Sequence, residues 1–365
     1  MDRREFLKTT GLAATAAATT TTTAAASSTS APVSAPAILP NTRELHMAMA
    51  WPDAVSGQAD CAHRLASRIE EATDRRYRIR ITAENSNAAV TLAKGEADLY
   101  HASEHDNADL DAAFSYFAGL PFSAGLAPGD LASWLAIGGG QELWDELAAE
   151  HGFKPLLAGH TGQSPRLWSN RPIGTLGDFK GLRISAYGPT ADVMRAIGAE
   201  TVAMPSYRLA AALRDRDIDA AEFGGALQAM AAGVAPAGNI ALETVSNGAG
   251  TAITLGISTR LWDGMSQSDR TIFTACAGEA YRLAVSENEA HEKVIMKTLT
   301  DLHGVTTASL TADARAALRS VTEAVVATLA STTPRAQRVN ASYMAFRRMV
   351  SPSDLATPST EIPLV

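Results

Sequence analysis

The segment 172–225 alternates between two hydrophobic periods. Short apolar runs typical of strands are separated by stretches in which apolar residues recur at helical spacing. The strand-like runs are 182–185, 201–203 and 218–223, and the helical stretches begin near Thr190 and at Ser206. Parallel strands need such crossovers, and strand twist makes the crossover right-handed. The segment therefore predicts a parallel unit of strand, helix, strand, helix, strand.

The carboxyl ends of these strands are the expected place for a ligand, because ligands of open parallel sheets bind beyond those ends. The residues there are Ser185, Met204, Glu222 and Phe223. We expect the cleft to lie against them.

The first part of the chain repeats the same order of elements. Strand-like alternation is found at 44–51, 77–81 and 97–101, with helical stretches at 56–72 and 88–92. Two such units predict an α/β fold with two lobes and a ligand cleft between them.

The rest of the chain is predicted to link and cover the two lobes. The stretch 159–168 is expected to cross between lobes as a strand, and the buried run 251–258 to return to the first lobe. A long amphipathic helix over 268–302 ends before Gly304, and two further helices follow at 311–330 and 335–349. Hinges are expected near Ser164 and Thr251.

The loop His101-Ala102-Ser103-Glu104-His105-Asp106-Asn107 follows the third strand of the first lobe and faces the predicted cleft. Its carboxylates and imidazoles leave three interpretations open. They are a solvated polar loop, a ligand-lining loop that uses His105, and a metal site, although the spacing matches no ligand motif.

Residues 1–37 are predicted to be a twin-arginine export signal. The stretch Asp2-Arg3-Arg4-Glu5-Phe6-Leu7-Lys8 precedes a weakly apolar run and a small-residue cleavage candidate at Ala35-Pro36-Ala37. The alternative is that residues 1–37 form a low-complexity tail without a targeting role. No later run approaches the roughly 20 apolar residues that span a bilayer, so the mature chain is expected to be soluble. With the export signal, it is expected in the periplasm.

Composition narrows the class of partner. The formal net charge is −8 and the pI is about 5.5, which argues against nucleic acid. Cys61 and Cys276 fall in helical patterns and are expected to be buried free thiols. No nucleophile elbow, dinucleotide fingerprint or metal-ligand spacing is present, so no enzyme activity is predicted.

The sequence of the segment 172–223 resembles that of the solute-binding subunits of TRAP (tripartite ATP-independent periplasmic) transporters. The residues that carry the resemblance are PI…DFKGLRI…VMRAIGAE…VAMP…AALRDRDIDAAEF. It is most similar to the group that binds 2-oxoacids and dicarboxylates. The resemblance implies a two-lobed solute-binding protein with C-terminal helices across both lobes. It also implies a membrane permease as partner and a monomer or homodimer.

Combined with the pattern, the resemblance gives these expected boundaries: signal 1–37, lobe I 42–163, lobe II 164–250, return strand and long helix 251–304, C-terminal helices 305–365.

In the resembled family, one arginine pairs with the ligand carboxylate through its planar fork. Ser185 stands at that position here. Three alternatives remain open. Arg166 enters from the neighbouring strand, or Arg183 serves through a shift in register, or no carboxylate is bound and Ser185 contacts a neutral or cationic ligand.

Other site residues also come from the resemblance. Glu222 is retained, and Phe223 replaces a tryptophan. Ser164 replaces a glutamine that helps to hold sodium in some members, so no cofactor is expected, with sodium beside the ligand as the alternative. Trp168 and Trp51 are candidates for stacking against the ligand or for the core.

The predicted function is capture of a small polar metabolite, either an organic acid or a neutral or cationic compound, for delivery to a permease. The competing hypotheses are an exported enzyme and a ligand-sensing subunit that docks to a receptor.

Overall fold

The computed structural model describes residues 42–53, 57–83, 87–162, 166–243 and 250–350. The predicted export signal and Ser164 lie outside these ranges. None of the helices in the described part of the chain is both long and apolar enough to cross a membrane.

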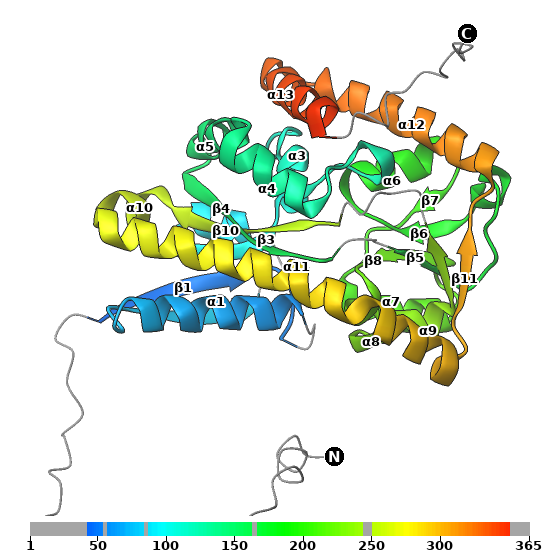
Figure 1. Ribbon diagram of the computed structural model, residues 1–365, viewed down its shortest axis with the longest axis horizontal. Helices are drawn as coiled ribbons and strands as arrows, with labels where there is room; N and C mark the ends of the chain where they lie inside the picture. Colours follow the sequence, from blue (N-terminus) through cyan, green and yellow to red (C-terminus); the bar gives the residue numbers. More distant parts are fainter. Residues whose placement is uncertain (1–41, 54–56, 84–86, 163–165, 244–249, 351–365) are drawn as a thin grey trace, which may run out of the picture. The chain divides into compact units, whose positions relative to one another are not determined.

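The first sheet has five strands in the order β2-β1-β3-β10-β4 (Figure 1). They are β1 (Arg43–Met49), β2 (Tyr77–Ala83), β3 (Leu99–Ser103), β4 (Phe153–His160) and β10 (Ala252–Ser258). β1 runs parallel to β2 and β3, whereas β10 lies antiparallel between β3 and β4. The apolar run 251–258 thus returns the chain to the first sheet, as predicted.

The second sheet has six strands in the order β11-β9-β5-β8-β6-β7. They are β5 (Arg166–Ser169), β6 (Arg183–Ser185), β7 (Glu200–Thr201), β8 (Ala220–Phe223), β9 (Ile240–Glu243) and β11 (Thr306–Ser309). β6 pairs in parallel with both β7 and β8, which confirms the predicted parallel unit.

The prediction of one strand over 159–168 is wrong. β4 ends at His160 in the first sheet, and β5 begins at Arg166 in the second. Gly162 has φ +97, which is not a strand conformation, so the ladder cannot continue through it.

Helices cover both faces of the first sheet. One face packs against α1 (Gln58–Ala72), α10 (Thr259–Gly264) and the first half of α11 (Gln267–His303). The other packs against α2 (Ala88–Ala93), α3 (Phe114–Ala118), α4 (Pro128–Ile137), α5 (Gly140–Ala149) and α13 (Pro334–Val350). Two short 3₁₀ helices, η2 (Glu104–Asn107) and η3 (Phe122–Ala124), lie in the connections.

The second sheet is covered in the same way. α6 (Gly188–Ala196), α12 (Ala312–Ala330) and the 3₁₀ helix η4 (Leu176–Phe179) pack on one face. α7 (Ser206–Arg214), α8 (Ala226–Ala231), α9 (Val234–Gly238) and the end of α11 pack on the other.

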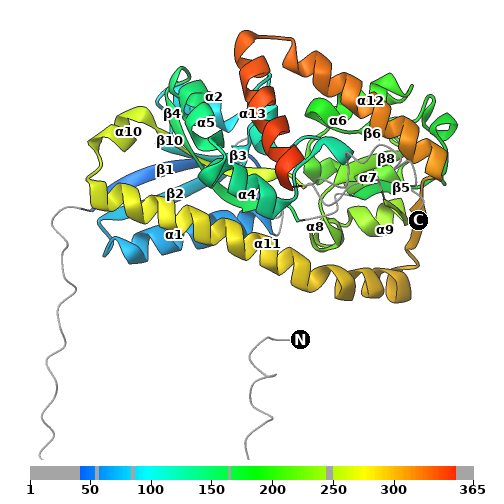
Figure 2. The ribbon, with the colours of Figure 1, turned by 45° about the horizontal axis from the view of Figure 1, so that its top comes forward.

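The 37-residue helix α11 runs along both sheets (Figures 1 and 2). Phe273 and Cys276 lie in the core of the first sheet, and Leu299 lies in the core of the second. Cys276 and Cys61 are both buried and free, as predicted. The two-lobed α/β architecture therefore stands, with one helix common to both cores.

Gly256 in β10 provides a test of this packing. A methyl group there would overlap the ring of Tyr100 on the neighbouring strand. Overfilling a packed core costs about 1–3 kcal/mol or more, so we expect Gly256→Ala to lower the free energy of unfolding by at least that amount in urea titrations. Gly264→Ala is the control, because nothing lies within 4 Å of the added methyl. Equal stabilities of the two variants would contradict the packing described.

Candidate ligand-binding site

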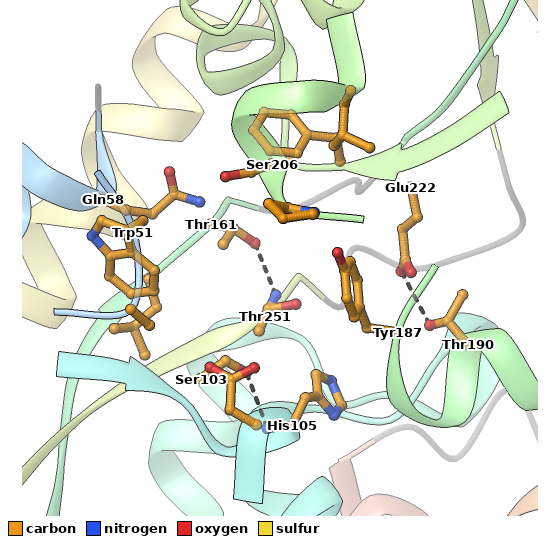
Figure 3. A pocket seen from close by; sticks show the side chains of 17 residues that line it. Trp51, Gln58, Ser103, His105, Thr161, Tyr187, Thr190, Ser206, Glu222 and Thr251 are labelled. Carbon is orange, nitrogen blue, oxygen red and sulfur yellow. Dashed lines mark hydrogen bonds between the residues drawn. The ribbon is translucent and has the colours of Figure 1, made fainter. Parts of the chain in front are cut away.

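A cavity of about 290 Å³ lies between the loops of the two sheets. Figure 3 shows Trp51 and Gln58 on one side of it and Glu222 and Thr190 on the other. Its walls come from residues that follow β1, β3, β6 and β8. The cavity therefore lies beyond carboxyl ends of strands in both lobes, where the sequence predicted a ligand.

Glu222 is the carboxylate of the second-lobe wall. The Thr190 hydroxyl donates a hydrogen bond to Glu222 Oε1 at 3.1 Å. Burial raises the pKa of Glu222 from 4.5 to about 7, although the bonds from Thr190 and the Tyr187 backbone favour the charged form. Near neutral pH the group is thus present in both protonation states.

His105 approaches from the first lobe. Burial lowers the pKa of its imidazole to about 4, so the ring is neutral at pH 7. Its Nδ1 atom is buried without a hydrogen-bond partner among the described residues. A methyl group at Gly188, the first residue of α6, would lie 2.9 Å from this atom. The ring of lobe I thus closely approaches the start of a lobe II helix.

Two further polar atoms of the first-lobe wall lack partners. Trp51 Nε1 and Gln58 Oε1 are buried and make no hydrogen bond within the described part of the chain. Leaving such groups unpaired costs free energy, so a bound molecule that pairs with them gains affinity. The ring of Trp51 is held edge-on against His101, with centroids 5.4 Å apart.

Tyr187 fixes two second-lobe loops relative to each other. Its hydroxyl accepts a hydrogen bond from the Met204 backbone N–H at 2.9 Å and donates to the Met204 carbonyl. The loop after β6 and the loop after β7 are therefore joined at the cavity, which Tyr187 lines.

The predicted site residues divide into two groups. Glu222, Phe223 and His105 line the cavity. Trp168 is fully buried in the core, where its Nε1 donates to the Phe223 carbonyl at 2.8 Å. Trp168 thus supports the wall from behind, and a stacking role is not favoured. Ser185 is fully buried and is not among the lining residues.

The two arginine alternatives also differ in position. Arg183 points to Asp219, with Nε and a terminal nitrogen donating to the two carboxylate oxygens at 3.1 and 3.2 Å. It does not line the cavity, so this geometry does not favour it as the clamp. The backbone of Arg166 lies opposite Phe223 in the β5–β8 ladder, next to the cavity wall.

Gln58, Thr161 and Tyr187 line the cavity but were not predicted. Tyr187 could have been found, because it follows the carboxyl end of β6 by two residues. Gln58 lies at the start of α1, and no local pattern distinguishes it from an exposed helix residue.

The polar loop after β3 contains both structural and cavity-lining residues. Glu104 is fully buried and accepts hydrogen bonds from the Tyr100 hydroxyl at 2.8 Å and from Asn107 Nδ2 at 2.7 Å. His105 and Asp106 line the cavity instead. Among the residues that the structure describes, no group of three or more His, Cys, Asp or Glu side chains is arranged to hold a metal ion.

Comparisons with known proteins identify the family and the fold. The model of bacterial extracellular solute-binding protein family 7 (DctP) matches residues 47–333. A monocarboxylate 2-oxoacid-binding periplasmic protein of Nostoc sp. is 28% identical over 230 residues, which are 62% of this chain. The match spans 61% of that relative's length.

Two solved structures show the same fold. A TRAP periplasmic solute-binding protein of Pseudoalteromonas atlantica with bound sodium and pyruvate has a TM-score of 0.79 and 21% identity, over 85% of this chain and 95% of that one. One of Chromohalobacter salexigens with bound (S)-2-amino-1-propanol has a TM-score of 0.75 and 16% identity, over 86% and 98% of the two chains.

The fold and the cavity define a two-lobed solute-binding protein. The family model covers well over half of the chain, so the protein belongs to bacterial extracellular solute-binding protein family 7.

The raised pKa of Glu222 predicts a pH-dependent contribution to stability. Between pH 4.5 and about 7 the folded state keeps the proton that the unfolded state releases, so the carboxyl group's contribution is present below pH 4.5 and is lost as pH rises through 7. The free energy of unfolding of Glu222→Gln minus that of wild type should therefore be larger at pH 8 than at pH 4. The expected change in this difference is about 1–3 kcal/mol, allowing for partial solvent screening. Urea unfolding at both pH values measures this, and a pH-independent difference would refute it.

Proposed function

We propose that this protein captures a small organic acid in the periplasm and delivers it to the membrane permease of a TRAP-type transporter. The main support for this proposal is the cavity of about 290 Å³, whose walls come from loops of both lobes. That volume lies at the small end for ligand sites and suits a metabolite of a few carbon atoms. The bound molecule leaves chemically unchanged.

Binding is coupled to lobe closure in this proposal. A ligand that contacts Trp51 or Gln58 of lobe I together with Glu222 of lobe II makes both sets of contacts only when the lobes are closed. Such differential contacts shift the population to the closed state. The permease then recognises that closed surface.

Arg166 is the proposed clamp for the ligand carboxylate. Its Cα pairs with that of Phe223, one residue from Glu222, at the edge of the cavity. An arginine fork binds a carboxylate through two parallel hydrogen bonds. The 2-oxoacid named for the Nostoc relative supports this class of ligand.

A second candidate is an ammonium ligand. Among the described cavity-lining side chains, the ionisable acids Asp106 and Glu222 are present and no lysine or arginine is. A partly buried carboxylate is stabilised by a cation. The amino alcohol bound by the Chromohalobacter protein supports this alternative.

The remaining expectations are proposals as well. Residues 1–37 direct export by the twin-arginine route, and the protein acts as a monomer or homodimer. No cofactor is required, and a sodium ion beside the ligand is the alternative. If the protein were an exported enzyme, it would convert its ligand to a product. If it were a sensor subunit, it would bind a receptor in place of a permease.

Arg166→Ala tests the clamp. The variant should lose measurable binding of pyruvate in isothermal titration calorimetry, because the ligand charge then has no cationic partner. Arg183→Ala is the matched control, since Arg183 pairs with Asp219 outside the cavity and should leave the affinity unchanged. Unchanged affinity in Arg166→Ala would exclude the clamp.

Glu222→Gln separates the two ligand classes. If the ligand is an amine, the variant should bind 2-amino-1-propanol more weakly by about 1.5–3 kcal/mol, the scale of a hydrogen bond to a charged group. Titrations of wild type and variant at pH 8, where Glu222 is ionised, measure the difference. Equal affinities would remove Glu222 from amine recognition.

A further inference from the structure

Two buried amide side chains meet behind the cavity wall, between α8 and α11. Gln228 is 2% exposed and Asn288 is 6% exposed. Gln228 Nε2 donates to Asn288 Oδ1 at 2.6 Å. Asn288 Nδ2 donates to the Ala284 carbonyl at 2.8 Å and reaches the His160 carbonyl at 3.5 Å. The pair thus joins a lobe II helix to the last residue of β4 in lobe I.

Four glycines surround this pair. A methyl group added at Gly162 would lie 2.9 Å from Asn288 Oδ1, and one added at Gly225 would lie 3.8 Å from the same atom. A methyl group added at Gly224 would lie 3.0 Å from Gln228 Cβ, and one added at Gly57 would lie 3.4 Å from Gln228 Cγ. Backbone from three separate segments therefore approaches the two amides closely. Gly224 lines the cavity, and Gly57 immediately precedes the cavity residue Gln58.

The loop 224–226 has two further ties. The Ala226 N–H donates to Glu292 Oε2, one turn beyond Asn288 on α11, at 2.9 Å. The Gly225 N–H donates at 3.4 Å to the carbonyl of Thr161, which lines the cavity. The loop directly after Glu222 and Phe223 is thus bound both to α11 and to the first lobe.

We propose that Gln228 and Asn288 are positioning residues that hold the wall 222–224 at its observed distance from lobe I. Gln228 Oε1 is buried without a partner among the described residues, and the bond from Nε2 to Asn288 offsets only the burial of the amide's donor group. Separating the lobes breaks the contact of Asn288 Nδ2 with the His160 carbonyl, and loss of the bond from Gln228 to Asn288 loosens the wall. The inference rests on the proposed function in that a ligand occupies this cavity.

The experiment compares Gln228→Leu and Asn288→Ala with wild type. The first readout is hydrogen exchange of residues 222–226 without ligand, which reports local opening. The second is the affinity for pyruvate. Loss of one buried hydrogen bond should speed the exchange and weaken pyruvate binding by up to about tenfold each.

Asn340→Ala is the matched control. Asn340 Oδ1 accepts a hydrogen bond from the Tyr116 hydroxyl at 3.1 Å, and this pair joins α13 to α3 away from the cavity. This variant loses a comparable hydrogen bond to an amide side chain. It should therefore lower the melting temperature and leave exchange at 222–226 and pyruvate affinity unchanged.

Unchanged exchange at 222–226 in both positioning variants would overturn the inference, as would an equal increase in the control. If Asn288→Ala does not fold, Gln228→Leu decides alone, because it keeps most of the side-chain volume. If wild type does not bind pyruvate, pyruvate is excluded as the ligand, and the exchange readout still decides the positioning role.

Discussion

The shared helix α11 is the constraint on which the two-lobed arrangement depends. Phe273 is buried against the first sheet and Leu299 against the second, so one helix belongs to both hydrophobic cores. The long helix cannot leave either core without exposing apolar surface, at roughly 25 cal/mol per Å². Relative motion of the lobes must therefore keep both ends of α11 packed.

The cavity combines groups that are poorly satisfied without a ligand. Burial lowers the pKa of His105 to about 4 and raises that of Glu222 to about 7, so both side chains tend toward their neutral forms. Trp51 Nε1 and Gln58 Oε1 lack partners among the described residues. A polar ligand that pairs with such atoms recovers part of the desolvation cost, which links binding to closure.

The spacing of hydrophobic residues was enough to predict the parallel unit from β6 to β8. Each strand and helix there shows the hydrophobic spacing typical of its type, and the crossovers are short. The carboxyl-end rule then placed Glu222 and Phe223 at the cavity. Pattern could not assign Arg183, whose partner Asp219 lies 36 residues further along the chain. It also could not tell that Trp168 faces the core, because strand alternation alone does not show which face of a sheet borders the cleft.

Thermal unfolding of residues 38–365 against 2-oxoacids, dicarboxylates, neutral polyols and small amines shows whether the protein binds a small metabolite. A ligand at about 100 times its dissociation constant adds roughly 2.7 kcal/mol to stability. A small acid should clearly raise the melting temperature of wild type and should not raise it when Arg166 is replaced by alanine. No rise with any compound in the panel would contradict a small-metabolite site in this cavity.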